Sequence, residues 1–268
     1  SRQMGNRKGE RRKNMRFGLC TDIKNVKEVE ELGFDYIDGK LNQIALLSEE
    51  DFESILKLFE NQKIKMERAS LLLPKTLSVM GDAYSEKELR DYLSVAFERM
   101  DRLNSKLVVF GSGKSRNFPQ TMKWQDAFLS LVKVTRLIGE IALEHSIEIA
   151  IEPLNREETN MINTLCEGAA LQAEVNLKNV GLLADSYHMR KEGEDFKRIL
   201  YCSPLLHTHI ALKEGRKYPT ESTEEVKEFF SLLKEAGYDG TMSIEGKSDD
   251  WKSDSVKALK VLREQNRN

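Results

Sequence analysis

From residue 16 onward, short apolar segments rich in strand-forming residues alternate with longer charged segments whose apolar residues recur at helical spacing. This alternation constrains the fold more than any other feature, because it is typical of parallel sheets whose strands are joined by helices. We expect eight strands, at 16–20, 34–38, 63–69, 106–111, 147–152, 180–185, 205–210 and 240–245.

Several helices between these strands have recognisable ends. The helix expected at 85–104 opens with Ser85 and a glutamate three residues later, the spacing of a capping box. The segment 124–145 carries its apolar residues on one side, and 221–236 is followed by Gly237, which is typical of a helix end. Helix and strand signals therefore agree on a repeated strand–helix unit.

A repeat within the chain supports this organisation. Residues 31–38 read Glu-Leu-Gly-Phe-Asp-Tyr-Ile-Asp, and residues 235–242 read Glu-Ala-Gly-Tyr-Asp-Gly-Thr-Met. Each is a helix end, a glycine, an aromatic-Asp pair and a strand start. Eight such units in about 250 residues predict a single-domain TIM (β/α)8 barrel over 15–268. A doubly wound open sheet is the competitor, and the lack of Gly-x-Gly-x-x-Gly after the first strand weighs against it.

Composition narrows the functional classes. The 268 residues have a formal net charge of −2, without the basic surplus of a nucleic-acid binder. No segment approaches the ~20 apolar residues of a membrane span. The cysteines, Cys20, Cys166 and Cys202, lack a CxxC pattern and indicate reduced thiols in a cytoplasmic protein. Residues 1–14 are basic without a following apolar stretch, so we expect a disordered tail or a cloning remnant rather than a signal peptide.

Four of the expected strands end on residues that can bind a metal: Glu152, Asp185, His209 and Glu245. Taken alone, an acid at a strand end is usually a helix cap or half of an ion pair. These four, however, are 33, 24 and 36 residues apart, close to the about 30 residues of one barrel unit. They therefore fall on successive strands, 5 to 8, whose carboxyl ends face one crater in a closed barrel.

Three carboxylates and one imidazole are the ligands of a hard or borderline divalent cation. This donor set favours Mn²⁺ or Mg²⁺, with Co²⁺ also tolerated. A structural zinc site would require thiolates, which the sequence does not place here.

The segments around these residues resemble a known family. Residues 151–156, Ile-Glu-Pro-Leu-Asn-Arg, resemble the strand-5 signature of sugar isomerases and epimerases with a xylose isomerase-like barrel, of the D-tagatose 3-epimerase/D-psicose 3-epimerase type. Residues 185–189 (Asp-Ser-Tyr-His-Met), 207–209 (His-Thr-His) and 243–245 (Ser-Ile-Glu) resemble its later motifs. The resemblance spans roughly 16–262.

This resemblance implies a set of site residues. It implies metal binding by Glu152, Asp185, His209 and Glu245, and substrate contacts from Glu158, His188 and Arg216. Arg216 lies seven residues after His209, one more than is usual in the family, and Lys217-Tyr218-Pro219-Thr220 replaces the usual Gly-x-Gly. A homodimer or homotetramer is also implied.

The chemistry expected is proton transfer next to a carbonyl. A cation bound to a ketose stabilises the enediolate that forms when the adjacent proton is removed, and carboxylates serve as general acid and base. We expect a metal-dependent isomerase or epimerase of a ketose or sugar phosphate, with Glu152 and Glu245 as catalytic residues. The alternatives are a metal-dependent dehydratase of the inosose or dehydroshikimate type and a non-catalytic sugar-binding barrel.

Three other polar segments lie near strand ends, and the sequence allows two roles for each. Residues 111–116, Gly-Ser-Gly-Lys-Ser-Arg, are either a flexible loop or a loop whose Lys114 or Arg116 touches an anionic or polyhydroxylated substrate. They do not match a phosphate-binding P-loop. The pairs at 38–40 and 67–68 either line the crater or form ion pairs.

Overall fold

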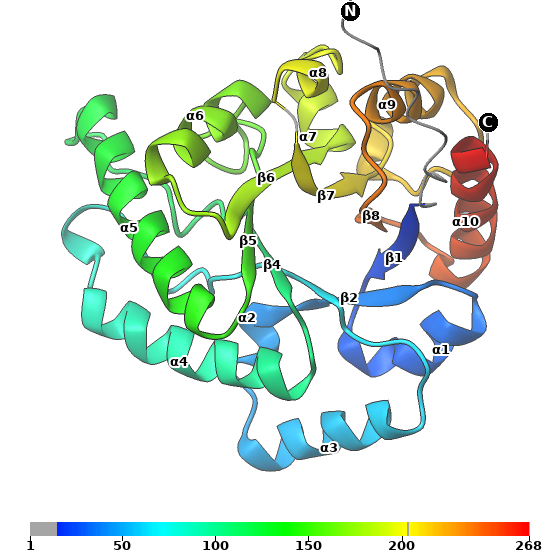
Figure 1. Cartoon of the computed structure of the whole chain (residues 1–268), viewed down its shortest axis with the longest axis horizontal. Helices are drawn as coiled ribbons and strands as arrows, with labels where there is room; N and C mark the ends of the chain where they lie inside the picture. Colours follow the sequence, from blue (N-terminus) through cyan, green and yellow to red (C-terminus); the bar gives the residue numbers. More distant parts are fainter. Residues whose placement is uncertain (1–14, 203, 268) are drawn as a thin grey trace, which may run out of the picture.

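The computed structural model describes residues 15–202 and 204–267. The prediction for residues 1–14 lies outside the described residues. Eight parallel strands form a closed barrel in chain order, with β8 pairing to β1. Helices surround this barrel (Figure 1), which confirms the predicted TIM barrel. The strands are β1 (Arg16–Cys20), β2 (Tyr36–Lys40), β3 (Arg68–Ser70), β4 (Leu107–Phe110), β5 (Glu148–Ile151), β6 (Val180–Asp185), β7 (Leu205–Ile210) and β8 (Thr241–Ile244).

The connections between strands are mostly helical. The helices are α1 (Val26–Glu31), α2 (Leu41–Ile44), α3 (Glu49–Glu60), α4 (Glu86–Arg102), α5 (Trp124–Glu144), α6 (Leu165–Val175), α7 (Ser186–Lys191), α8 (Arg198–Cys202), α9 (Glu224–Glu235) and α10 (Trp251–Arg267), with 3₁₀ turns η1 (Ile23–Asn25), η2 (Gly81–Ala83) and η3 (Glu214–Arg216).

The expected helix ends are largely confirmed. The Ser85 hydroxyl accepts a hydrogen bond from the Glu88 amide at 3.3 Å and caps α4. Helix α9 begins three residues later than expected, because the hydroxyl of Thr223 provides its cap. Gly33 and Gly237, the glycines of the internal repeat, both have positive φ angles, of +89° and +74°. Each therefore ends a helix in the conformation that glycine adopts most easily.

The prediction for the third strand was partly wrong. Instead of residues 63–69, only Arg68–Ser70 form β3. The amides of Lys63 and Ile64 donate to the Glu30 carboxylate at the end of α1, at 2.5 and 3.0 Å. These two amides are therefore not available to a neighbouring strand, which explains why residues 63 and 64 lie outside β3.

The barrel interior has an apolar side and a polar side. Leu107, Val109, Ala150 and Leu183 pack together inside β4–β6. On the opposite side the Tyr36 hydroxyl lies 3.0 Å from that of Ser243, which in turn donates to Asp38. These polar contacts join β2 to β8, one of the four strands whose ends carry the candidate site.

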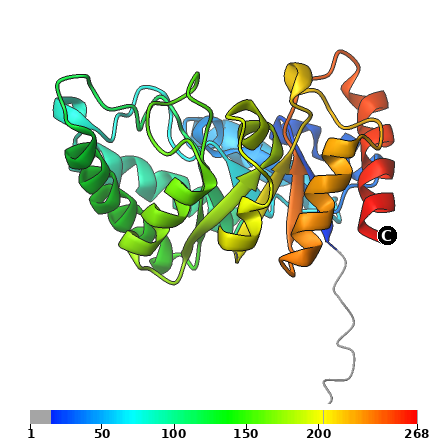
Figure 2. The same ribbon diagram turned by 90° about the horizontal axis from the view of Figure 1, so that it is seen from above.

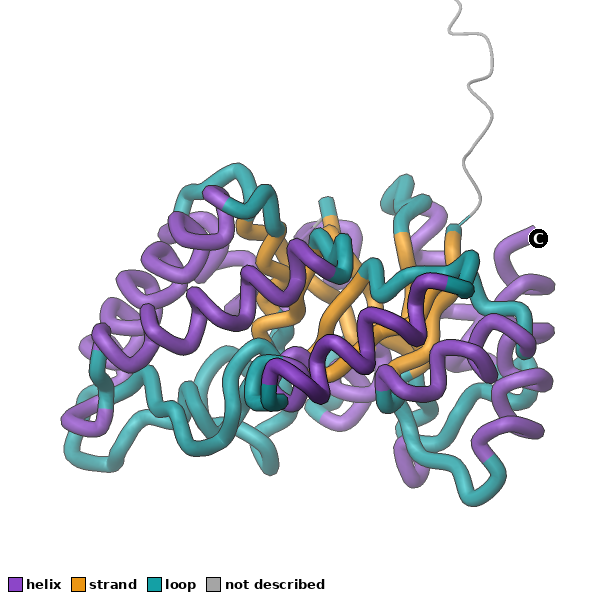
Figure 3. The backbone as a smooth tube through the Cα atoms, turned by 90° about the horizontal axis from the view of Figure 1, so that it is seen from below, coloured by secondary structure: helices purple, strands orange, loops and turns teal. Residues whose placement is uncertain are grey.

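The loops that follow the strands gather at one end of the barrel, the lower edge of Figure 3, and the opposite end carries shorter connections (Figures 2 and 3). Active sites of TIM barrels lie at this carboxyl end of the strands. All three cysteines are free in this structure. None of the helices in the described ranges combines the length and apolar character needed to cross a membrane.

Candidate metal centre

The strand ends of β5 to β8 bring four candidate ligands into the barrel mouth. Alternate residues of a strand share a face. Ala150 and Leu183 pack inside the barrel, so Glu152 and Asp185, two residues further along, face the same way. On β7, His209 pairs in register with Asp185 of β6. The barrel geometry thus converts the sequence spacing into spatial proximity.

The four side chains surround one imidazole nitrogen. Nδ1 of His209 lies 3.0 Å from Oε1 of Glu152, 3.5 Å from Oε2 of Glu245 and 3.8 Å from Oδ2 of Asp185. One ligand atom from each residue lies within 4.8 Å of each of the others. The Glu152, Asp185 and His209 side chains are buried, and that of Glu245 is 21% exposed. The cluster therefore opens to solvent on the Glu245 side.

The two glutamates of the cluster differ in their proton affinity. Burial raises the pKa of Glu152, and the nearby Glu245 and Asp185 carboxylates raise it further, against the effect of His209. Burial would also raise the pKa of Glu245, but His209 and the Arg216 guanidinium hold that pKa well below its ordinary range. Three carboxylates close together favour binding of a cation, because it relieves their mutual repulsion.

The donor atoms fit a divalent metal. Asp185 Oδ1 accepts hydrogen bonds from the amides of Tyr187 and His188 at 2.7 and 3.3 Å. Its second oxygen, Oδ2, is buried and has no hydrogen-bond partner among the described residues. A buried carboxylate oxygen without a partner is costly and is explained if it binds an ion. With three oxygens and one nitrogen, the cluster is a potential site for a hard or borderline cation.

Asp38 lies on the far side of the His209 ring. Its Oδ2 is 3.6 Å from Nε2 of His209 and 3.5 Å from Nε2 of His207. Ser70 donates to its other oxygen at 2.6 Å. Burial would raise the pKa of Asp38, but the two imidazoles hold it well below its usual range. No hydrogen bond joins Nε2 of His209 to this carboxylate, but the nearby negative charge favours a proton on Nε2. Nδ1, which contacts Glu152 at 3.0 Å in this structure, would then be the nitrogen that binds a metal.

From the sequence, Asp38 was expected either to line the crater or to form an ion pair, and the structure places it beside the two imidazoles of β7. It lies within β2 rather than at its end, and its partners, on β3, β7 and β8, are distant in the sequence. The only available signal was an acid close to the end of an apolar segment.

The three residues expected to contact a substrate also lie beside the cluster. Arg216 donates to Glu245 at 2.6 Å and to Glu158 at 3.3 Å, and its guanidinium lies 4.7 Å from the centre of the Tyr187 ring. Nε2 of His188 is 3.8 Å from Asp185. The structure therefore brings all seven predicted site residues together.

Arg116, in the polar loop after β4, does not contact the cavity as one of the two interpretations of this loop required. Arg116 is fully buried, and its guanidinium donates to the backbone carbonyls of Phe110, Glu152 and Ile162 at 2.9, 2.7 and 3.3 Å. Burial lowers the pKa of Arg116 to about 10. It cannot reach a substrate and instead fixes the backbone at Glu152.

The other two polar pairs lie at opposite ends of the barrel. Glu67 and Arg68 lie at the start of β3, away from the mouth, where Glu67 pairs with Arg16 at 2.5 Å. The idea that they line the crater was wrong, because β3 begins later than expected. Lys40, at the end of β2, does line the mouth.

A cavity of about 500 Å³ opens over the cluster. Its wall includes Glu152, Glu158, His188, Arg216 and Glu245, together with residues that follow β2, β3 and β4. This volume lies within the range of sites for small ligands.

Comparison with known proteins connects this geometry to described enzymes. The family model described as xylose isomerase-like TIM barrel matches residues 26–265. The chain is 29% identical over 242 residues to 3-dehydro-D-guloside 4-epimerase of Escherichia coli, covering 84% of this chain and 87% of the relative. It is 25% identical over 228 residues to D-psicose 3-epimerase of Agrobacterium fabrum, covering 82% and 77%.

Solved structures agree on the fold. The crystal structure of a D-allulose 3-epimerase from Methylomonas sp. matches with a TM-score of 0.83 at 22% identity, covering 94% of this chain and 98% of that one. An E. coli 3-keto-D-glucoside 4-epimerase matches with a TM-score of 0.77 at 20% identity, covering 93% and 99%.

Proposed function

The chain belongs to the xylose isomerase-like TIM barrel family, and from this premise we propose that it is a metal-dependent epimerase of a keto sugar. The proposal assigns the reaction to the barrel that begins at residue 15. It rests most directly on one observation, the convergence of Glu152, Asp185 and Glu245 around Nδ1 of His209.

Relatives matched over most of their length support the choice of reaction. The E. coli relative is named as a 4-epimerase of 3-dehydro-D-guloside, and the A. fabrum relative as a 3-epimerase of D-psicose. Both names describe inversion of a carbon next to a keto group. The same chemistry, proton transfer alpha to a carbonyl through an enediolate, is what a cluster of carboxylates and a cation can perform.

Glu152, Asp185, His209 and Glu245 would hold the ion, and their donor set favours Mn²⁺ or Mg²⁺, with Co²⁺ also accepted. When bound, such an ion would polarise the carbonyl of the substrate and stabilise the negative charge that develops on its oxygen, and so make the proton on the neighbouring carbon more acidic. The remaining steps belong to side chains of this chain.

Two carboxylates on separate strands suit an inversion. Epimerisation removes a proton from one face of a carbon and returns a proton to the other face. Glu152 follows β5 and Glu245 follows β8, and both lie beside the His209 ring. We assign one as the proton acceptor and the other as the donor, with their roles exchanged in the reverse direction.

Arg216, Glu158 and His188 would orient the sugar. Arg216 holds Glu245 through a charged hydrogen bond of 2.6 Å, and the same guanidinium contacts Glu158. His188 receives hydrogen bonds from Asn155 at 3.1 Å from its backbone and 2.9 Å from its side chain. Their polar atoms at the edge of the cavity suit the hydroxyl groups of a sugar.

Deuterium exchange tests this proposal. The protein is incubated in D₂O with a panel of ketoses, and exchange at the carbon beside the carbonyl is followed by NMR. We expect exchange with formation of the epimer, loss of both after EDTA, and recovery with Mn²⁺. Formation of an ultraviolet-absorbing enone would identify a dehydratase instead. Binding without exchange would identify a sugar-binding barrel. A homo-oligomeric state and a cytoplasmic location stay predictions from the sequence.

A further inference from the structure

Four lysines line the cavity over the metal cluster. They are Lys40 at the end of β2, Lys75 in the loop after β3, Lys114 in the loop after β4, and Lys247 after β8. They come from four separate segments: three follow the neighbouring strands β2, β3 and β4, and Lys247 follows β8. A sugar without charge would not require this concentration of ammonium groups.

These four charges are not neutralised by the protein. Within the described residues, no carboxylate forms a hydrogen bond or an ion pair with any of the four ammonium groups. The acids lining the same cavity have other partners: Glu152 contacts His209, Glu157 pairs with Lys191, and Arg216 takes both Glu158 and Glu245. Like charges facing one concave surface create a positive potential that attracts an anion.

Two of the lysines lie on loops that are fastened to each other. The hydroxyl of Ser112 accepts a hydrogen bond from the Leu73 amide at 3.0 Å. The hydroxyl of Ser115 donates to the Pro74 carbonyl at 2.9 Å. Lys75 follows Pro74 directly, and Lys114 precedes Ser115. These two hydrogen bonds therefore hold the backbone segments that carry Lys75 and Lys114 against each other.

The loop after β4 also offers backbone donors. Over the described part of the chain, neither the Gly113 nor the Lys114 amide donates a hydrogen bond to another protein group. A Cβ atom at position 113 would lie 2.7 Å from the Glu158 carbonyl oxygen, so a glycine is required for this close approach. Free amides beside lysines provide the donors that bind oxyanions.

We propose that the substrate carries a phosphate monoester at the end of its carbon chain remote from the metal cluster, and that Lys75 and Lys114 bind this group. The inference rests on the proposed function and narrows it to keto-sugar phosphates. Lys40 and Lys247 add to the positive field. A phosphate ester carries about −1.5 to −2 charges at pH 7 and three acceptor oxygens, which matches several lysines better than the single charge of a carboxylate.

The test compares each free ketose with its terminal phosphate. D-Fructose and D-fructose 6-phosphate form one pair, and D-ribulose and D-ribulose 5-phosphate another, with D-fructuronate as the carboxylate arm. Deuterium exchange gives kcat/KM for each in the Mn²⁺-loaded protein. We expect the phosphates to be preferred. The double variant Lys75→Gln/Lys114→Gln should lower kcat/KM for the phosphates by about 10²–10⁴-fold, since each charged contact is worth roughly 10–100-fold, and should lower kcat/KM for the free ketoses far less.

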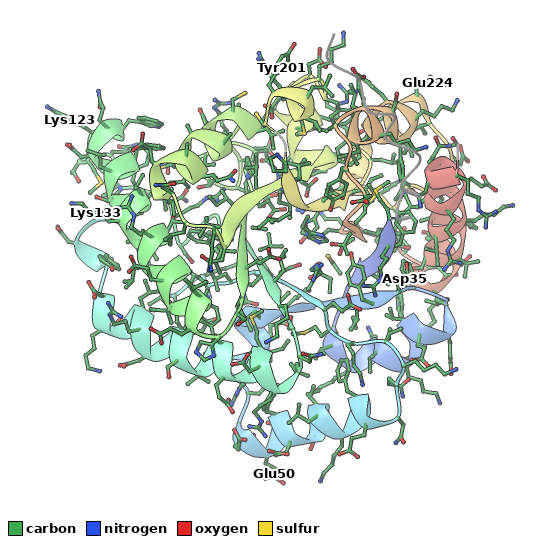
Figure 4. The ribbon with its side chains drawn as sticks, in the orientation of Figure 1. Asp35, Glu50, Lys123, Lys133, Tyr201 and Glu224 are labelled. Atoms are coloured by element: carbon green, nitrogen blue, oxygen red, sulfur yellow. The ribbon has the colours of Figure 1, made fainter. Side chains whose placement is uncertain are left out.

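Lys133→Gln provides the matched control. Lys133 lies on α5 at the outer edge of the molecule, far from the mouth (Figure 4), and this variant should behave as the wild type toward every sugar. A preference for D-fructuronate over the phosphates would overturn the assignment to a phosphate ester. Equal turnover of free and phosphorylated sugars, unaffected by the lysine changes, would overturn the subsite but leave the epimerase intact.

A binding measurement separates this inference from the proposed function. Inorganic phosphate is titrated calorimetrically into the metal-free protein, without any turnover. We expect saturable binding that the double variant weakens by at least about 10-fold and that Lys133→Gln preserves. If this holds while no sugar is exchanged, the subsite stands and the epimerase proposal fails. Absence of lysine-dependent phosphate binding would overturn the subsite.

Discussion

A terminal nitrogen of Arg216 lies 2.6 Å from Oε2 of Glu245, and the same guanidinium reaches Glu158 at 3.3 Å. Arg216 has a φ angle of +53°, an uncommon conformation for a residue other than glycine. It follows Gly215, whose φ angle is +66°. The backbone thus turns sharply to bring the arginine over the cluster, despite the sequence spacing that differs from the family pattern.

Replacing Arg216 with alanine should weaken substrate binding. Loss of a charged donor from the cavity predicts a KM about 10–100-fold higher, while the metal content, measured by atomic emission, stays at the wild-type value. Arg216→Lys should restore only part of the affinity, because an ammonium group does not reproduce the planar guanidinium. A normal KM in the alanine variant would remove Arg216 from substrate binding.

Glu152→Gln should abolish turnover without unfolding the barrel. An amide cannot accept the proton that the reaction removes, so we expect kcat to fall by at least about 10²–10⁴-fold. Circular dichroism and the melting temperature should remain near those of the wild type. Glu140→Gln, on the exposed face of α5, is the control and should be fully active. Unchanged activity of Glu152→Gln would exclude this carboxylate from the mechanism.

Binding of a metal should stabilise the fold. An ion that binds only the folded state stabilises it by about 2.7 kcal/mol at a concentration 100 times its Kd. We expect Mn²⁺ to raise the melting temperature of the EDTA-treated protein. Asp185→Asn should greatly reduce this shift, although its side-chain oxygen can still cap α7. An equal shift in that variant would show that the ion binds elsewhere.

Arg116→Met should cost the protein much of its stability. The buried guanidinium donates to three backbone carbonyls. Removing it leaves the Glu152 carbonyl without a donor among the described residues, while the Phe110 and Ile162 carbonyls keep the amides of Glu152 and Leu154. A loss of about 1–3 kcal/mol is expected when a buried acceptor loses its donor, measured by urea denaturation. A loss below about 1 kcal/mol, typical of a surface substitution, would show that the network contributes little.

The free energy of unfolding should depend on pH through the titration of Glu194. Burial raises the pKa of this carboxyl to about 7, even though it accepts a hydrogen bond from the Leu165 amide. The pKa of Glu194 in the folded protein lies above the unfolded value of about 4.3. Protonated Glu194 therefore stabilises the fold fully below about pH 4.3, and this stabilisation is lost as the pH rises to about 7.

Comparison with Glu194→Gln measures this effect. From pH 4 to pH 8 the wild type should lose stability relative to the glutamine variant, by about 1 kcal/mol once the partial exposure of the group is taken into account. The readout is urea denaturation of both proteins across this pH range. A difference that does not change with pH would show that Glu194 titrates normally.

The sequence was sufficient for features that repeat along the chain. The strand–helix alternation predicted the barrel, and the spacing from Glu152 to Glu245 predicted the cluster, because a closed barrel turns regular spacing into proximity. Long-range contacts were not predictable in this way. Nothing in residues 111–116 indicates that the Arg116 side chain turns back toward the backbone instead of the mouth. Likewise, the carboxylate that binds the amides of Lys63 and Ile64 belongs to Glu30 on α1, more than thirty residues earlier in the chain.

The positions of the polar residues divide the chain into two parts. The four candidate ligands come from β5 to β8, whereas Lys40, Lys75 and Lys114 precede β5. Recombination with a homologous gene just before β5 would therefore exchange these three lysines, and with them the proposed phosphate contacts, while keeping the four candidate ligands. Such a chimera would have to retain Arg116, since this residue of the N-terminal half supports the backbone of Glu152 in the other.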